Sequence, residues 1–443
     1  MASTRVFAMR AAVVTGVVAA ATVLGSAPAR ATPTTLYVGG AGCSDTGPGS
    51  ATQPFCTITK GAAVAVAGQT VEVAAGTYNG QVSVGHSGTA GAPIVLRPAT
   101  GAAVTVTSTA AGFSVSGKSY VTISGFTVAG TTSYGIKLSS SNNIVVSGNT
   151  VTGAGEPFSG QLASGIYLSG TSASTVTGNN SHHNSDHGIY LTSTTTTTVV
   201  SYNEASWNAN GYRRNANGIN VIGTSNTVVG NILHDNEDSG LQFYTGGNDN
   251  LAVSNVVYNN GDHGIDNLNV TGGRIIGNTV FHNCTSGINV EGTSGSYLVA
   301  NNIAVDNAVY PAYNGISCAR RKGNIGIWDS APSSTIVDSN LVFLTTAGTM
   351  YAFGSSYTSL AAMKAATGQE QHGLQADPLF ADADAGNLRL LAGSPAIDSA
   401  DSGASGAQPT DVLGVTRVND PATANTGLGP RTYDDRGAYE YTP

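Results

Sequence analysis

Charged residues and long apolar segments are both scarce in this chain. Asp, Glu, Lys and Arg make up only 10% of the 443 residues, and the formal net charge is −8. Lys and Arg never cluster beyond two or three neighbours, which argues against nucleic acid as a partner. After the first thirty-one residues, no segment stays apolar over the roughly 18 to 20 residues of a membrane-spanning helix. We therefore expect no membrane partner for the mature chain.

The N-terminus has the pattern of a secretory signal peptide. Arg5 and Arg10 precede an apolar run over residues 11–24, and the small-residue sequence Ala29-Arg30-Ala31 follows. A signal peptide over residues 1–31 predicts that the mature protein is secreted to the extracellular space. The alternative is a buried amphipathic first helix, but no second helical segment follows to pack against it.

Cysteine is also rare, with four residues, and none of them forms a Cys-x-x-Cys pair. That absence argues against a zinc site. The four cysteines fall into two sequence-local pairs, and an exported chain meets oxidising conditions. We therefore expect two disulfides, Cys43–Cys56 and Cys284–Cys318.

Glycine, in contrast, is abundant, with 58 residues, and many of them belong to a repeat. Eight segments from ISGFTV to VANNIA align at spacings of 23, 30, 24, 28, 24, 23 and 23 residues, the length of one β-helix coil with occasional insertions. The aligned positions are Phe126, Asn149, Asn179, Asn203, Asn231, Asn255, Asn278 and Asn301. A second series marks another strand, each glycine preceding Ile or Leu: Gly135, Gly165, Gly188, Gly218, Gly240, Gly264 and Gly287.

Both series predict an all-β fold, a right-handed parallel β-helix of about 10–12 coils. We interpret the asparagines as scaffold, each amide hydrogen-bonding to the next coil at a sharp bend. Residues 32–340 are expected to form the solenoid, with a short capping helix near residues 57–66. Residues 341–443 are expected to form an irregular C-terminal cap with a helix near residues 359–366.

Three coils carry insertions at the same corner. The distance from the asparagine to the glycine is nine residues in four coils, but 16 (149 to 165), 15 (203 to 218) and 14 (301 to 315) elsewhere. We expect these loops to wall a cleft, although tolerated surface insertion is the alternative. They carry aromatic and charged side chains suited to sugar rings and their substituents: Glu156, Phe158, Trp207, Tyr212, Arg213, Arg214, Tyr310 and Tyr313.

Alternation along the strand after each glycine predicts the floor of this cleft. Ile or Leu after the glycine points inward, so the residues on either side point outward. Because adjacent coils are about 4.8 Å apart, Asp238, Asp262, His263 and Asp266 can meet in one patch. The residues expected to bind substrate around it are Asn217, Gln242, Tyr244, Asp266, Tyr190, Tyr212 and Glu291.

This patch has three interpretations. In the first, which we favour, Asp238, Asp262 and Asp266 hold calcium for β-elimination on an acidic, uronate-containing polysaccharide. His263 would then remove the C5 proton, and Arg213 or Arg214 would stabilise developing charge. In the second, Asp238 and Asp262 hydrolyse a glycan without a metal. In the third, the protein is a non-catalytic glycan-binding or cell-surface solenoid, and the Asp and Asn side chains only keep this face hydrated. In each case the partner is a polysaccharide, and we expect a monomer.

The LYV start, the AGQTVEVAAGTY segment, the coil repeats and the SPAIDS to GAYEY ending resemble secreted β-helix proteins of the pectin-lyase-like superfamily. That superfamily includes lyases, glycoside hydrolases and epimerases, so the resemblance implies a fold more narrowly than an activity. Ala216-Asn217-Gly218 and Asp238-Ser239-Gly240-Leu241-Gln242 resemble the calcium motifs Ala-Asp-Gly and Asp-Asp-Gly-x-Asp of polysaccharide lyase family 9. The segment Asp262-His263-Gly264-Ile265-Asp266 matches the second motif better. The resemblance also implies a lysine base, but no lysine follows in these coils before Lys322.

Overall fold

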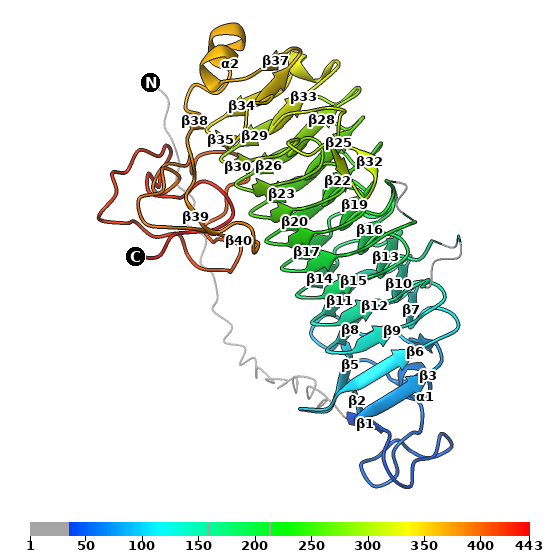
Figure 1. Cartoon of the computed structure of the whole chain (residues 1–443). Coiled ribbons are helices and arrows are strands. Elements are labelled where there is room, and N and C mark those ends of the chain that lie inside the picture. Colours follow the sequence, from blue (N-terminus) through cyan, green and yellow to red (C-terminus); the bar gives the residue numbers. More distant parts are fainter. Residues whose placement is uncertain (1–34, 157–159, 161, 212–213) are drawn as a thin grey trace, which may run out of the picture. The chain divides into compact units, whose positions relative to one another are not determined.

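The computed structural model describes residues 35–443, except 157–159, 161, 212 and 213. The expected signal peptide, residues 1–31, lies outside the described residues. The described chain forms a solenoid in which successive coils add strands to three twelve-stranded sheets (Figure 1). Equivalent strands of neighbouring coils pair in parallel, which confirms the predicted parallel β-helix. No helix of the described chain is long and apolar enough to cross a membrane.

The three sheets run side by side along the solenoid. The first contains β1 (Thr35–Val38), β2 (Thr70–Val73), β5 (Ile94–Pro98), β8 (Ser119–Ser124), β11 (Asn142–Ser147), β14 (Thr175–Thr177), β17 (Val199–Ser201), β20 (Thr227–Val229), β23 (Leu251–Val253), β26 (Arg274–Ile276), β29 (Leu298–Ala300) and β34 (Ile336–Asp338). The second, called the site sheet below, contains β4 (Val82–Ser83), β7 (Phe113–Ser116), β10 (Ile136–Ser139), β13 (Ile166–Ser169), β16 (Ile189–Leu191), β19 (Ile219–Val221), β22 (Leu241–Phe243), β25 (Ile265–Leu268), β28 (Ile288–Glu291), β33 (Ile325–Ile327), β36 (Tyr351–Phe353) and β37 (Ser356–Tyr357). The third contains β3 (Gly76–Asn79), β6 (Val104–Thr107), β9 (Thr127–Ala129), β12 (Thr150–Thr152), β15 (Asn180–His182), β18 (Glu204–Ser206), β21 (Ile232–His234), β24 (Val256–Tyr258), β27 (Thr279–Phe281), β30 (Ile303–Val305), β35 (Leu341–Phe343) and β38 (Leu374–Gln375).

A ladder of buried asparagines lies at one bend of the solenoid, as predicted. Each side-chain amide donates to the amide oxygen of the next asparagine at 2.9–3.0 Å. The predicted member Asn301 is wrong by one position, because Thr279 pairs with Ile303 and so aligns Asn278 with Asn302. Asn301 instead has a positive φ and donates to the carbonyl of Asp401.

A second asparagine ladder, absent from the prediction, fills the next bend. Its members are again joined from side chain to side chain at 2.9–3.1 Å: Asn184, Asn208, Asn236, Asn260, Asn283, Asn307 and Asn324. This ladder explains the glycine series. A Cβ on Gly264 would lie 2.8 Å from the amide nitrogen of Asn283 and 2.5 Å from the carbonyl oxygen of Gly287. In the coils that carry the glycine, a side chain at this position would therefore clash with the ladder.

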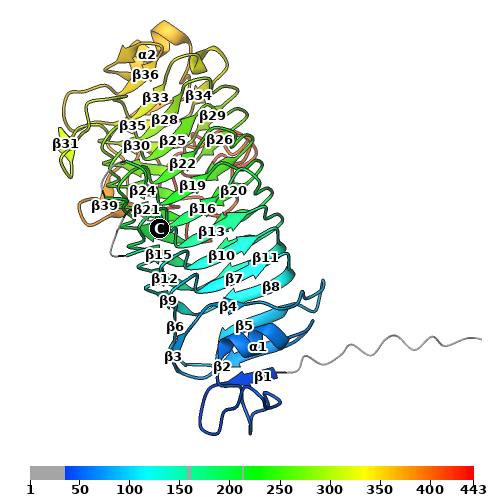
Figure 2. The same cartoon turned by 90° about the vertical axis from the view of Figure 1, so that its right-hand side faces the viewer.

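The two ends of the solenoid are covered by short helices (Figure 2). Helix α1 (Ile58–Val64) buries Ile58 and Ala62 at the first coils, and α2 (Leu360–Thr367) buries Leu360 and Met363 at the last. Parallel strands continue to β38, past the expected boundary at residue 340. Later residues, including the antiparallel strands β39 (Phe380–Asp382) and β40 (Asn387–Leu390), pack along the side of the third sheet. A 3-10 turn spans Ala331–Ser333.

Candidate functional site

A polar cavity of about 550 Å³ lies on the outer face of the site sheet, over β16, β19, β22, β25 and β28. It brings together eight of the residues expected to form the site: Tyr190, Arg214, Asp238, Gln242, Tyr244, Asp262, Asp266 and Glu291. It is also lined by Asp186, His187, Asn220 and Arg320. The alternation of the strands points the first three outward onto the floor, although they are not among the predicted site residues, whereas Arg320 was not predicted there. Tyr212 and Arg213, expected in the site, lie outside the described residues, as does Phe158.

Asp262 is the most heavily engaged carboxylate of the cavity. The hydroxyl of Thr285 donates to its Oδ1 at 2.7 Å, Arg320 pairs with its Oδ2, and a guanidinium nitrogen of Arg214 lies 3.8 Å from Oδ1. Burial alone would raise the pKa of Asp262, but His263, Arg320 and Arg214 outweigh burial and lower that pKa. Asp262 therefore carries a stable negative charge.

Asp238 lies one coil away and behaves in the opposite way. Its side chain is buried, and within the described part of the chain its carboxyl group makes no hydrogen bond or ion pair. Burial raises the pKa of Asp238 well above its usual range, and the negative charges of Asp262 and Asp266 raise it further. The pKa values of two neighbouring carboxyls are thus shifted in opposite directions, which is the arrangement that separates an acid from a base.

His263 lies beneath the cavity floor, with no exposed side-chain surface. Its Nδ1 is 2.7 Å from the hydroxyl oxygen of Thr285. Because the single hydroxyl hydrogen of Thr285 already goes to Asp262, the contact requires His263 Nδ1 to carry a hydrogen and donate it. In the neutral form of the ring Nε2 is then unprotonated. Among the described residues Nε2 has no hydrogen-bond partner, and it lies 3.9–4.0 Å from oxygens of Asp262 and Asp266.

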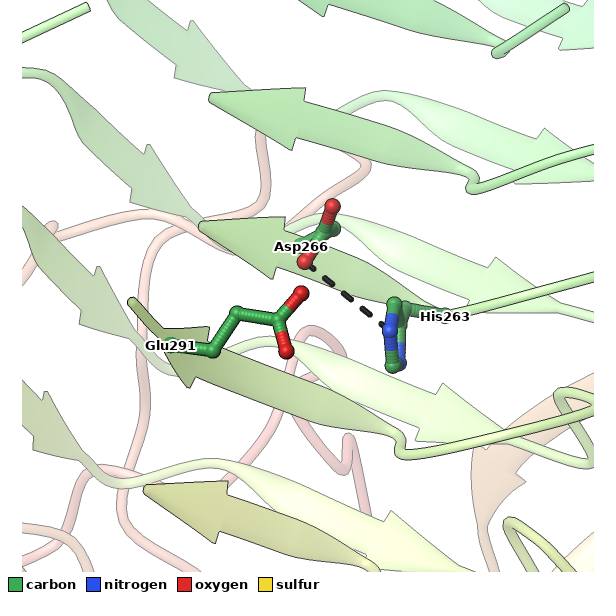
Figure 3. Close-up of side chains that lie close together, drawn as sticks. All are labelled: His263, Asp266 and Glu291. Carbon is green, nitrogen blue, oxygen red and sulfur yellow. Dashed lines mark ion pairs between the residues drawn. The ribbon is translucent and has the colours of Figure 1, made fainter. Parts of the chain in front are cut away.

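The positions of His263, Asp266 and Glu291 appear together in Figure 3. One ligand atom from each lies within 4.8 Å of the others. Among the residues that the structure describes, these three form the group that could hold a metal ion. This group differs from the predicted set of Asp238, Asp262 and Asp266, of which it contains only Asp266. Asp266 also accepts hydrogen bonds from the amides of Gln242 (2.8 Å) and Asn289 (2.7 Å).

A second histidine, His187, lines the cavity wall three coils before His263. His187 Nδ1 accepts the backbone N–H of Asn217 at 3.0 Å, so its neutral ring carries hydrogen on Nε2. The expected substrate residue Asn217 is itself buried and hydrogen-bonds to Gln242 at 3.1 Å. Burial lowers the pKa of His187, although Asp186 opposes this. His187 is therefore a neutral wall residue, and its ring packs edge-on against Tyr190.

The third expected insertion is larger than the sequence spacing indicated. The site sheet resumes at β33, where Ile325 pairs with Ile288, and not at the predicted Gly315. The intervening chain forms an antiparallel hairpin of β31 (Ala312–Tyr313) and β32 (Ile316–Ser317). We call residues 308–323 the arginine hairpin, because it brings Arg320 to the cavity and pairs Arg321 with the cavity residue Glu291 at 2.7 Å.

Both expected disulfides are present in the structure. Cys43 bonds to Cys56 beside α1, and Cys284 bonds to Cys318. The second bond joins the arginine hairpin to the coil that contains Thr285, which binds Asp262 and His263.

Comparison with known proteins identifies the family. The model of the right handed beta helix region matches residues 94–226 and 164–342, more than half of the chain, which therefore belongs to this family. Residues 41–97 match a family of proteins of unknown function, DUF1565. No curated protein sequence matches.

Solved structures share the fold over most of the chain. Pectate lyase Pel9A is 16% identical, with a TM-score of 0.56 over 93% of this chain and 97% of that one. XylC in complex with xylose is 12% identical, with a TM-score of 0.53 over 87% of this chain and 97% of that one. At such low identity these matches confirm the pectin-lyase-like fold, and the choice of chemistry depends on the site itself.

Proposed function

We propose that this protein is a secreted lyase that cleaves an acidic, uronate-containing polysaccharide by β-elimination. The observation that carries the proposal is the convergence of Arg214 and Arg320 on the cavity beside the carboxyl of Asp238, whose pKa burial raises. Guanidinium groups match carboxylates in charge and shape, so such a cavity favours a sugar that carries a carboxylate. Two disulfides fit an extracellular protein, and a pectate lyase shares the fold.

The proposed reaction uses two groups of the site. His263 Nε2 removes the proton from C5 of the uronate, and the C5–H electron pair forms the C4–C5 double bond. The C4–O bond breaks, and Asp238 gives its proton to the departing oxygen. The arginines stabilise the negative charge that develops on the substrate carboxylate.

His263 is suited to the role of base by its hydrogen bonds. Thr285 fixes the tautomer that leaves Nε2 unprotonated, and Asp262 and Asp266 lie close enough to stabilise the imidazolium that forms. Nε2 lies below the floor in the substrate-free protein, so the proposed reaction requires substrate binding to expose Nε2 to the cavity.

The test is ultraviolet absorbance of the unsaturated product during incubation with polygalacturonate, alginate, glucuronoxylan and rhamnogalacturonan. We expect a rise on one of these, reduced about 100- to 10,000-fold in His263→Ala and in Asp238→Asn. The exposed His86→Ala, on the first coils, is the matched control and should retain full activity. Activity should also fall with rising pH as Asp238 loses its proton, and Asp238→Asn should remove this limb. Absence of absorbance on all four substrates contradicts the proposal.

Hydrolysis remains a second candidate because of the opposed states of Asp238 and Asp262. A protonated acid beside an ionised carboxylate is also the requirement of a glycosidase. New reducing ends without ultraviolet absorbance would identify this reaction, and Asp262→Asn should then abolish it.

A further inference from the structure

We propose that arginine side chains, held in place by the Cys284–Cys318 disulfide, bind and neutralise the substrate carboxylate in this site without calcium. This inference rests on the proposed uronate substrate and names the groups that recognise it. Arg320 is the principal carboxylate-binding residue, and Arg214 supports it.

The arginine hairpin is fixed to the solenoid at two neighbouring points. Cys318 bonds to the fully buried Cys284, and Arg214 donates to the carbonyl of Ser317 at the end of the hairpin. Arg214 also lies 3.7 Å from the sulfur of Cys284. Arg320 follows Cys318 by only two residues, so the disulfide limits how far its guanidinium can move from Asp262.

Arg320 is held by the buried carboxylate of Asp262, but about half of its side chain remains exposed. Its side chain is 49% exposed, whereas that of Asp262 is 3% exposed. One side of the guanidinium therefore holds a buried carboxylate while the other faces the cavity. An arginine presents five N–H donors, which suffice for the carboxylate of Asp262 and that of a bound uronate.

A calcium ion does not fit these residues. Calcium takes six to eight oxygen ligands at about 2.3–2.6 Å. Here Asp262 is bound by Thr285 and Arg320, and Glu291 is bound by Arg321. Both oxygens of Asp266 accept amide hydrogen bonds, and His263 offers only a nitrogen, a poor ligand for this cation. Asp238 is a carboxyl of the cavity without such a partner in the described chain, but one carboxyl cannot supply six to eight oxygen ligands.

The electrostatics of the cavity lead to the same result. Arg214, Arg320 and Arg321 bring three positive charges to the carboxylates of the floor. A divalent cation would have to displace these guanidinium groups to reach the carboxylates. An anionic sugar is attracted where it meets the open face of Arg320, and the arginines can take over the charge neutralisation that the resemblance to family 9 assigned to calcium.

The first experiment measures binding separately from catalysis. Isothermal titration of chelator-treated protein with calcium chloride should give no heat of binding. Oligogalacturonate and oligoalginate are then titrated in EDTA, with xylo-oligosaccharide as the neutral control. We expect one acidic oligosaccharide to bind better than the neutral one. Arg320→Ala should weaken that binding about 10- to 100-fold, as expected for a hydrogen-bonded charge.

Three variants separate recognition from folding. Arg320→Lys should recover only part of the affinity, because an ammonium lacks the planar fork. Cys284→Ser combined with Cys318→Ser should weaken acidic oligosaccharides selectively, with unchanged far-ultraviolet circular dichroism. Arg97→Ala, at the first coils and paired with Glu72, should leave binding unchanged.

Each result decides one of the two proposals. Stoichiometric calcium binding that Asp262→Ala abolishes, together with calcium-dependent binding of the sugar, overturns the inference but leaves the lyase intact. Acidic binding that needs Arg320 without any unsaturated product supports the inference and contradicts the lyase. Equal binding of acidic and neutral oligosaccharides overturns the inference.

Discussion

Removing one amide from the first asparagine ladder should destabilise the whole solenoid measurably. Asn255 is fully buried and takes part in four side-chain hydrogen bonds at 2.9–3.0 Å. In Asn255→Ala the backbone N–H of Asn231 loses its acceptor, and the Val228 carbonyl and Asn278 amide oxygen each lose a donor.

The expected loss follows from these contacts. An orphaned buried amide costs about 1–3 kcal/mol, and each further lost hydrogen bond about 0.5–1.5 kcal/mol. Water that enters the space left by the side chain can replace some of these bonds. We therefore expect the free energy of unfolding to fall by about 3–5 kcal/mol.

Urea unfolding monitored by circular dichroism measures this loss. The exposed Asn425→Ala is the control and should change stability by no more than about 0.5 kcal/mol. Because solenoids can unfold in parts, hydrogen exchange should be followed at the Asn231 amide as well. A loss below about 1 kcal/mol, with unchanged protection at Asn231, would refute the view that the ladder stabilises the coils.

Two further changes test other parts of the fold. Gly264→Ala should destabilise by at least about 2 kcal/mol, because the added Cβ would meet the second ladder and a carbonyl; the exposed Gly348→Ala is the control, and equal urea midpoints would contradict the explanation. Burial raises the pKa of Glu370 to about 7 despite hydrogen bonds from Asn340 and Tyr351. The native state therefore binds the extra proton, and stability should fall by up to about 3 kcal/mol as pH rises from about 4.5 to about 7. Glu370→Gln should flatten this dependence, and identical pH profiles of unfolding for the two proteins would show that the group is not shifted.

The solenoid could be predicted because the asparagine and glycine positions repeat in the sequence at the length of one coil. The second ladder could have been found as well. In six coils an asparagine follows the first ladder by five residues, as in 179 to 184 and 278 to 283. The same spacing from 302 to 307 identifies Asn302, and not Asn301, as the ladder member. Alignment of the coils on Asn302 and Asn307 would have revealed the full length of the third insertion.

The contacts of the arginine hairpin could not be derived in the same way. The strand resumes at Asn324, which occupies the place that glycine holds in the preceding coil, so the glycine series gave no signal for where the loop ends. The partner of Arg320 depends on a hairpin whose path is set by a disulfide and by Arg214 rather than by coil register. Tertiary contacts of this kind do not produce a repeating pattern in the sequence.

Two copies of the same four-residue motif show that the neighbours of a histidine, and not its own segment, determine its chemistry. Asp-His-Gly-Ile occurs at 186–189 and at 262–265, with both histidines at the same position before the strand. His187 accepts a backbone N–H and is held with hydrogen on Nε2, whereas His263 donates from Nδ1 to Thr285 and its Nε2 has no hydrogen-bond partner in the described part of the chain. The strand then continues with Tyr190 in one coil and Asp266 in the other. Since the solenoid positions both motifs alike, the neighbouring coil and the arginine hairpin determine which histidine can act as a base.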